Sequence, residues 1–264
     1  MEKVLCVSSL RGLSRWKSSY ARLYFGAEFC QRLIPKKDEL KKALEFCKKR
    51  KINFSLMTPF VTDEGMAKLK PLFKLLDKYQ LENEIIVNDL GVAFFLSKNF
   101  SHIPLCWGRL LNKQKRDPRI AGVLSLLPKA ARHYFRVPVG ESIFTTDFKN
   151  KFNIKRIELD NLIQGIERQY ARIPASLYYP YVYVTTTRYC LVGLAFHEKG
   201  FKRKVTFKCY RECQKYSFCL ENQKMPAKIY LKGNTQFVYN PYIPQGLRRL
   251  NINRIVYEQD LLDK

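Results

Sequence analysis

The stretch from residue 22 to residue 58, RLYFGAEFCQRLIPKKDELKKALEFCKKRKINFSLMT, decides the fold. It opens with a short apolar run at 22–26 and closes with another at 52–58, and both are typical of buried strands. Between the two runs, apolar side chains recur at helical spacing: Leu40, Ala43, Leu44 and Cys47. Asp38 near the start and Lys48, Lys49 and Arg50 at the end suit the helix dipole. The order strand, helix, strand predicts one βα unit of a parallel sheet.

The same alternation recurs along the chain. Further strands are expected at residues 4–7, 84–88, 103–110 and 154–159, and helices at 64–79, 91–97 and from 160 to about 170. The Tyr-, Val- and Thr-rich region 176–186 favours β structure, and 229–231 with 237–239 should form a hairpin-like pair of strands. Seven or so strands alternating with helices predict an α/β fold, a (β/α)8-type (TIM-like) barrel, complete or imperfect.

The length of 264 residues fits one such barrel, and a chain that is 46% apolar and 27% charged is not disordered throughout. We expect residues 1–186 to form the barrel. Residues 187–264 should supply a cysteine-rich insertion and a short C-terminal β segment that complete the same domain. No apolar run is long enough to cross a bilayer, so no transmembrane segment is expected. The N-terminus lacks the pattern of a secretory signal, which predicts a cytoplasmic protein.

The charge balance is extreme, because 48 Lys and Arg against 23 Asp and Glu give a net charge of +25. Such an excess favours contact with polyanions, namely RNA, anionic lipid or acidic partners. A lysine-rich bias of the whole proteome would produce the same excess. The segment Lys202-Arg203-Lys204, with Phe201 and Phe207 beside it, suits stacking on single-stranded RNA bases, or is a solvated loop.

Polar residues follow the ends of successive expected strands, where barrels of this type build their active face. Seven of them are candidate substrate-binding residues: Glu28, Arg32, Asn88, Asp89, Arg109, Glu158 and Asp160. Asn112 and Asn161 occupy similar positions. Arg32 and Arg109, with Lys113, suit an anionic donor, since Arg pairs bidentately with carboxylates. The alternative is that each residue caps a helix or ties down a loop, with Asp89 and Asn161 as N-caps.

Eight cysteines are present, and four of them fall within thirty residues: Cys190, Cys209, Cys213 and Cys219. In a cytosolic chain, clustered cysteines indicate metal or redox chemistry more than disulfides. The chain has no C-x2-C pair of the zinc-ribbon kind and no C-x3-C-x2-C pattern. A single x3 pair with distant single cysteines fits an iron–sulfur cluster held between separate elements. Structural zinc on the same residues is the alternative.

Cys30 directly follows the strand at 22–26, and Cys190 follows the β region at 176–186. In a barrel both would lie near one rim. Cys30 can therefore join Cys190, Cys209 and Cys213 as the fourth metal ligand, and Cys219 competes for that role. The other three cysteines lie in apolar patterns and are interpreted as packing residues: Cys6, Cys47 and Cys106.

Several motifs, in order, resemble the collagenase-like peptidase family U-thirty-two (U32). They are Leu23–Arg32, Thr58–Pro59, Val87–Gly91, Arg156–Asp160, Arg188–Leu191 and Cys209-x3-Cys213, and they extend over roughly residues 3–240. The resemblance implies a barrel that carries a 4Fe–4S cluster. Its better-understood members are oxygen-independent hydroxylation factors for ubiquinone precursors or RNA bases, and some use prephenate as the oxygen source.

The resemblance also implies ligands and partners. The ligand pattern is similar to that of the family's ubiquinone-pathway accessory subunit, in which one cysteine ligand lies in the strand-two motif, where Cys30 stands. On this basis Cys30, Cys190, Cys209 and Cys213 would hold the cluster. The protein would be an oxygen-independent hydroxylase, or a subunit of one with a homologous heterodimer partner. The spacing from Cys190 to Cys209 and the additional Cys219 depart from the family pattern, which leaves the subfamily and substrate open.

Two other functions were weighed. A peptidase, as the family label says, has little support, because the three histidines at 102, 133 and 197 accompany no G-x-S-x-G or H-E-x-x-H motif. A non-catalytic, cluster-bearing partner subunit is consistent with the short length and with Cys30.

Overall fold

A computed structural model describes residues 1–79, 81–138, 146–169, 171–196, 208–223, 225–259 and 261. The strands are β1 Glu2–Val7, β2 Arg22–Gly26, β3 Asn53–Met57, β4 Asn83–Val87, β5 Leu105–Trp107, β6 Ile154–Asp160, β7 Ala175–Tyr179, β8 Tyr181–Thr186, β9 Phe218–Leu220, β10 Ile229–Lys232, β11 Thr235–Tyr239 and β12 Ile252–Glu258. The α-helices are α1 Lys37–Arg50, α2 Asp63–Asp77, α3 Leu90–Asn99, α4 Ile120–Val123, α5 Lys129–Arg136, α6 Thr146–Lys151 and α7 Leu191–Ala195. The 3-10 helices are η1 Leu10–Arg15, η2 Gln31–Leu33, η3 Leu124–Leu126, η5 Glu212–Gln214 and η6 Leu247–Leu250.

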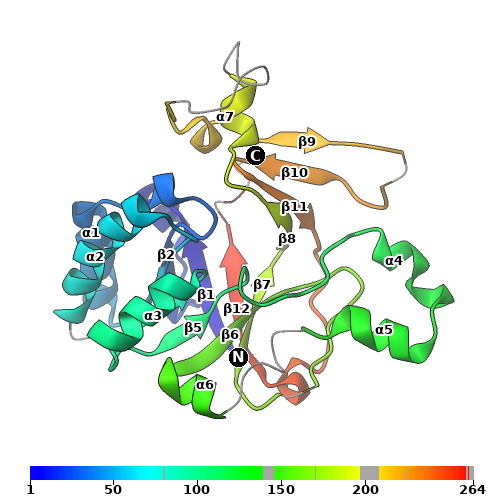
Figure 1. Cartoon of the computed structure of the whole chain (residues 1–264), viewed down its shortest axis with the longest axis horizontal. Coiled ribbons are helices and arrows are strands. Elements are labelled where there is room, and N and C mark those ends of the chain that lie inside the picture. The colour runs from blue at the N-terminus through cyan, green and yellow to red at the C-terminus, as the bar shows by residue number, and fades with distance from the viewer. Residues whose placement is uncertain are drawn as a thin grey trace.

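Eight parallel strands close into a barrel in the order β1-β12-β7-β6-β5-β4-β3-β2. This confirms the (β/α)8-type architecture. Helices α1, α2 and α3 cover the outside of the first half of the barrel (Figure 1). The quoted stretch forms β2, α1 and β3, and the buried face of α1 carries the four residues expected there: Leu40, Ala43, Leu44 and Cys47.

The ring of helices is incomplete. The helix expected from 160 to about 170 does not form in the described residues 160–169, which are turns and extended chain after β6. Side chains of this segment bind distant backbone instead, since Asn161 Nδ2 donates to Tyr242 O (2.7 Å) and Gln164 Nε2 donates to Lys115 O (2.6 Å). These long-range hydrogen bonds take the place of helical ones, so the N-cap interpretation of Asn161 is wrong.

A second sheet lies beyond the barrel rim, above the barrel in Figure 1. It has four antiparallel strands in the order β8-β11-β10-β9, and β10 with β11 forms the expected hairpin. The region 176–186 is divided between the two sheets, because β7 belongs to the barrel and β8 to the second sheet. Conversely, β12 near the C-terminus closes the barrel between β1 and β7. The C-terminal segment thus completes the same fold, although residue 186 is not the edge of the barrel.

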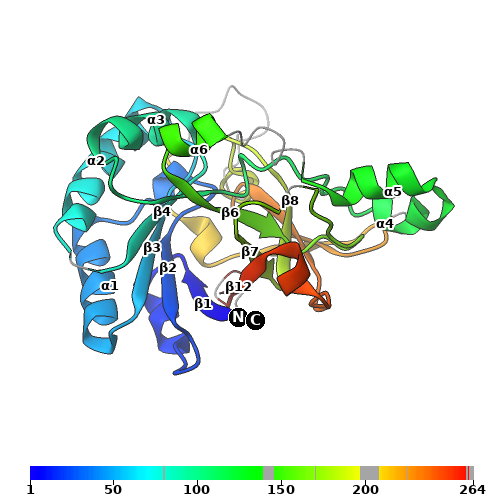
Figure 2. The ribbon, with the colours of Figure 1, turned by 90° about the horizontal axis from the view of Figure 1, so that it is seen from below.

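The barrel interior is unusually polar. Below the rim, Arg254 pairs with Glu84 and with Glu2, whose carboxylate Arg22 also contacts at 2.9 Å. Burial raises the pKa of Glu84, but Arg254 and Arg22 outweigh it and lower that pKa to about 2. An apolar layer that includes Val4, Tyr24, Met57, Ile86 and Val256 lies above these charges. Figure 2 looks at the barrel from the opposite end to the second sheet.

Candidate functional site

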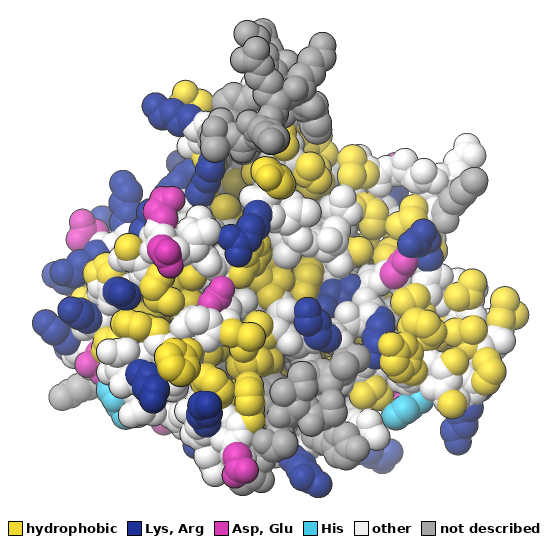
Figure 3. Space-filling model, in the orientation of Figure 1, with side chains coloured by type: hydrophobic (Ala, Val, Ile, Leu, Met, Phe, Trp, Pro, Cys, Tyr) yellow, Lys and Arg dark blue, Asp and Glu magenta, His cyan; other side chains and the backbone are white. Residues whose placement is uncertain are grey.

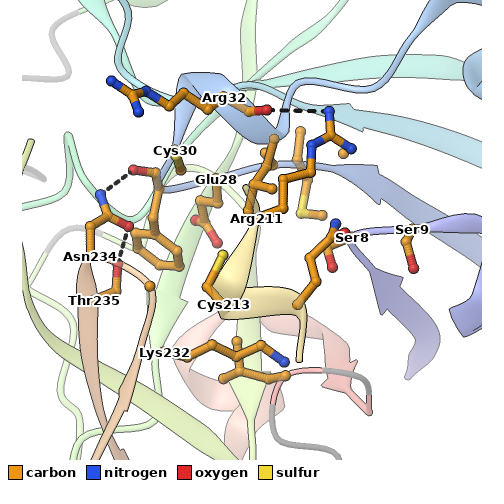
Figure 4. Close-up of a pocket in the computed structure, with 18 of the residues that line it drawn as sticks. Ser8, Ser9, Glu28, Cys30, Arg32, Arg211, Cys213, Lys232, Asn234 and Thr235 are labelled. Carbon is orange, nitrogen blue, oxygen red and sulfur yellow. Dashed lines mark hydrogen bonds between the residues drawn. The ribbon is translucent and has the colours of Figure 1, made fainter. Parts of the chain in front are cut away.

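A pocket of about 830 Å³ lies between the barrel rim and the second sheet. Its wall includes the segments that follow β1 and β2, the end of β12 and the turn between β10 and β11, through Ser8, Glu28, Glu258 and Asn234 (Figure 4). The carboxyl ends of the barrel strands therefore form its floor, as is usual for sites in such barrels.

Five cysteines line this pocket, and four of them come from three separate segments outside the barrel strands. Cys30 precedes η2, Cys190 is the N-cap residue of α7, and Cys209 and Cys213 precede and occupy η5. The four thiols are near enough to perturb one another electrostatically. The structure thus brings together the residues that the sequence analysis selected as metal ligands.

Backbone N–H groups point at these sulfur atoms. Gly193 N donates to Cys190 Sγ over 3.3 Å, and Arg211 N donates to Cys209 Sγ over 3.4 Å. Cys30 accepts backbone hydrogen bonds from Arg32 and Leu33, the last two residues of η2. Hydrogen bonds of this kind favour a thiolate over a thiol.

Burial acts in the opposite direction. It raises the pKa of the Cys30 and Cys190 thiols, and it raises that of Cys213 to about 12, with the neighbouring thiols adding to the effect. A positively charged metal centre would reverse this balance, because thiolates rather than thiols bind metals.

The hairpin turn of the second sheet packs directly against one of these cysteines. Gly233 has a φ of +65°, and a Cβ there would lie 3.3 Å from Cys213 Cβ and 3.6 Å from its Sγ. A side chain would both strain the turn and press on the sulfur. The turn therefore holds Cys213 in place.

Cys219 does not share the pocket. It lies on β9 with its side chain exposed, and its nearest polar partner is Glu221 Oε1 at 3.9 Å. Of the two cysteines that compete for the fourth position, Cys30 lines the pocket and Cys219 does not. Cys6, Cys47 and Cys106 are buried, as expected, and Cys6 also reaches the pocket floor, where its thiol contacts Met57 Sδ at 3.6 Å.

Within the described ranges, no three side chains of His, Cys, Asp or Glu converge closely enough to hold a single metal ion. Of the histidines, His102 pairs with Asp77 and His133 with Glu167, both at the surface and away from the pocket. His197 lies outside the described residues.

Arg109 is enclosed and not open to a substrate. Its side chain is fully buried, and it donates to Glu28 (2.6 Å), Glu258 (2.6 Å) and Asp160 (3.0 Å). Asp160 also accepts from Arg116 Nε at 2.7 Å. Burial raises the pKa of Glu258 to about 8 although Arg109 acts to lower it. Arg109 and Asp160 therefore support the floor from below, whereas Glu28 reaches the pocket itself.

Three more candidate residues have structural roles. Asn88 Nδ2 donates to Thr58 O and its Oδ1 accepts from Leu110 N, both at 3.0 Å. Asp89 is the N-cap of α3, which confirms the capping interpretation for that residue. Glu158 points into the barrel and accepts from Tyr24 Oη (3.1 Å) and Ser176 Oγ (3.0 Å). Of the seven candidates, only Glu28 and Arg32 line the pocket.

Sequence reasoning missed most of the pocket cations. Among the described residues, six cationic side chains line the pocket: Arg11, Arg15, Arg32, Arg188, Arg211 and Lys232. Three acidic residues do so, and two of these, Glu28 and Glu258, are bound by Arg109. The pocket is therefore positively charged. Arg11 and Arg15 follow the end of β1, so the rule that singled out Glu28 could also have found them.

No protein-family model matches the chain, and no curated protein matches it in sequence. Among solved structures, the U32 peptidase Mk0906 aligns with 98% of this chain and 92% of its own, at 10% identity and a TM-score of 0.47. Human YKL-39, described as a pseudo-chitinase with retained chitooligosaccharide binding, aligns with 98% of this chain and 93% of its own, at 10% identity and a TM-score of 0.30. Similarity at this level says nothing about activity.

Two remaining expectations concern a membrane-spanning segment and a basic segment suited to RNA. Across the described residues, no helix combines the length and apolar character needed to span a bilayer. The basic segment Lys202–Lys204, with Phe201 and Phe207, lies outside the described residues.

Proposed function

We propose that Cys30, Cys190, Cys209 and Cys213 hold a 4Fe–4S cluster, and that the protein acts in an oxygen-independent hydroxylation, as the enzyme or as a subunit of it. The convergence of these four cysteines on one pocket carries the proposal. When bound, the cluster would supply one-electron transfer at the pocket wall. The resemblance to family U32, in the motifs given above, supports the type of reaction.

The donor set fits such a group. Four thiols come from three segments, and backbone N–H groups point at three of them. A set of cysteines that comes from separate segments and lacks a C-x2-C pair favours a cluster, and structural zinc on the same residues is the alternative.

The residues of the chain itself would bind the reactants. The pocket cations suit an anionic substrate or oxygen donor, because Arg binds carboxylates and phosphates through charge-assisted pairs. Of the three cations expected to bind an anionic donor, Arg32, Arg109 and Lys113, only Arg32 lines the pocket, and Arg109 is occupied by three carboxylates. Glu28, held by Arg109, would orient a donor group of the substrate at the pocket floor.

The decisive experiment is anaerobic purification followed by iron and sulfide analysis and a visible spectrum. We expect about four irons and four sulfides per chain, with broad thiolate-to-iron absorption. Cys30→Ala should lower both counts and the absorption. Cys219→Ala is the matched control, because it removes an exposed cysteine outside the pocket and should leave the cluster intact.

Three results would contradict the proposal: stoichiometric zinc, no metal in anaerobically prepared protein, or a cluster lost from Cys219→Ala and retained in Cys30→Ala. The substrate class needs a separate measurement. Binding of tRNA or rRNA that weakens steeply with salt would favour an RNA base, whereas no binding at low salt would favour a ubiquinone-type precursor. Co-purification of a homologous second chain would identify the protein as the accessory partner subunit.

A further inference from the structure

A helical arm projects from the barrel on the side opposite α1, α2 and α3 (Figures 1 and 2). The arm is defined as residues 118–136 and contains α4, η3 and α5. Of the residues in these three helices, only Leu124 is buried. An isolated helix as short as α5 is marginal in water, and burial of an apolar face normally stabilises it. The arm therefore has helical structure but little buried surface of its own.

Helix α5 is amphipathic, but part of its basic face is turned toward the protein and its apolar face toward solvent, the reverse of an ordinary surface helix. One stripe is basic: Lys129, Arg132, His133 and Arg136. The C-terminal half of that stripe faces the body of the protein, where Glu167 accepts from His133 Nδ1 (2.5 Å) and Arg136 Nη1 (3.1 Å). The opposite stripe carries Tyr134, which is 59% exposed. Lys115 Nζ lies 3.8 Å from the centroid of the Tyr134 ring, so this stripe is covered only in part.

The tip of the arm extends this apolar surface. Leu126 is 81% exposed and Val123 is 48% exposed. Figure 3 shows hydrophobic side chains gathered over α4 and α5 at the right-hand end of the molecule. A single exposed leucine needs no explanation, but two aliphatic side chains and a tyrosine on one protruding arm form a patch of the kind that marks an interaction site.

The charge around the patch indicates what covers it. Residues 118–136 contain no Asp or Glu, and Lys129 and Arg132 are exposed beside the apolar tip without an ion pair to any described residue. Arg119, at the base, is neutralised by Asp117 at 2.6 Å. An apolar patch flanked by cations that have no acidic partner among the described residues complements a partner surface with an apolar interior and an anionic outer layer.

We propose that this arm docks the protein onto an anionic lipid surface, with Val123 and Leu126 inserted between acyl chains and Lys129 and Arg132 at the headgroup phosphates. Interfacial amphipathic helices bind by this combination of buried apolar area and attraction to anionic lipid. A nucleic acid would use the cations and aromatics but not the aliphatic tip. This interface goes beyond the proposed function and does not depend on the cysteine site.

The test is flotation of the full-length protein with vesicles at low salt. We expect binding to phosphatidylcholine vesicles that contain about 30% phosphatidylserine, and weak binding to phosphatidylcholine alone. The double variant Val123→Ser/Leu126→Ser should bind about tenfold more weakly or worse. Lys129→Gln and Arg132→Gln should each weaken binding about fivefold, and only on the anionic vesicles.

Tyr242→Ser is the matched control, because Tyr242 is 80% exposed and lies outside the arm. It should bind as the unchanged protein does. Absence of binding by the unchanged protein, equal binding by the double variant, or equal weakening by Tyr242→Ser would each overturn the proposal. So would an arm-dependent dimer in analytical ultracentrifugation, which would assign the patch to a second copy. Loss of single-stranded RNA binding in the double variant, with vesicle binding unchanged, would assign it to RNA.

Discussion

Replacing Arg109 by Met should cost about 4 kcal/mol of the free energy of unfolding at neutral pH. The structure gives the reason, because the fully buried guanidinium lies within 3.0 Å of three carboxylates: Glu28, Glu258 and Asp160. Methionine fills a similar volume but leaves those charges with Arg116 as their nearby cation. Breaking a buried pair by removing one partner typically costs 3–5 kcal/mol, roughly the range expected here.

The same geometry predicts how this loss depends on pH. Burial raises the pKa of Glu258 from 4.5 to about 8, and loss of Arg109 would raise it further. Between these values the folded variant binds more protons than the unfolded chain, so its stability falls as pH rises. The unchanged protein shares this fall up to about pH 8, so the destabilisation measured by urea unfolding should be nearly constant between pH 5.5 and pH 7 and larger near pH 9.

An exposed pair provides the control for this prediction. Arg119→Met removes a surface pair with Asp117 in which Arg119 is 69% exposed, and it should leave stability almost unchanged. Arg109→Lys keeps a charge and serves if the Met variant does not fold. A loss below about 1 kcal/mol for Arg109→Met, or a loss that grows toward low pH, would refute the reasoning.

Two further predictions concern the barrel. Glu158→Gln should flatten the pH dependence of stability between about pH 5 and pH 8 by about 3 kcal/mol, because burial raises the pKa of Glu158 from 4.5 to about 8, so that in this window the folded carboxyl keeps a proton that the unfolded chain has lost. Urea midpoints that shift with pH equally in both proteins would contradict it. Gly26→Ala should cost about 2 kcal/mol or more, because φ is +129° and the new Cβ would lie 2.5 Å from Met57 O. Thermal unfolding measures the loss, and Gly122→Ala, which meets nothing within 4 Å, is the control.

Local patterns predicted the first half of the barrel well, and long-range pairing explains where they failed. Strand β2 and helix α1 were expected almost within their observed bounds, because their side chains follow one clear period. Strand β12 was missed because Arg254 and Glu258 occupy inward positions that an apolar core would fill. Their charges are compensated by residues such as Glu84 and Arg109, far away in sequence, so the segment does not resemble a buried strand.

The same difference between local pattern and long-range pairing applies to the candidate site. Cys30 could be placed with the late cysteines because a residue that directly follows a barrel strand must lie at the rim. The role of Arg109 could not be seen, because its partner Glu258 is separated from it by 149 positions and lies on the missed strand. Whether a residue lies on the barrel rim can thus be predicted from local pattern. Whether its side chain is exposed to the pocket depends on which oppositely charged residues lie beside it in the folded protein.

The cysteine pocket lies between two sheets, and one side chain hydrogen-bonds to segments of both. Asn234, in the turn between β10 and β11, donates to Phe29 O (2.7 Å) on the barrel rim and to Thr187 O (2.5 Å) beyond β8. Phe29 precedes Cys30, Thr187 lies near Cys190, and the neighbouring Gly233 contacts Cys213. The same turn therefore sets the position of all three segments that bring cysteines to the pocket. A cluster bound there would stabilise the junction, and the junction would in turn hold the cluster's ligands.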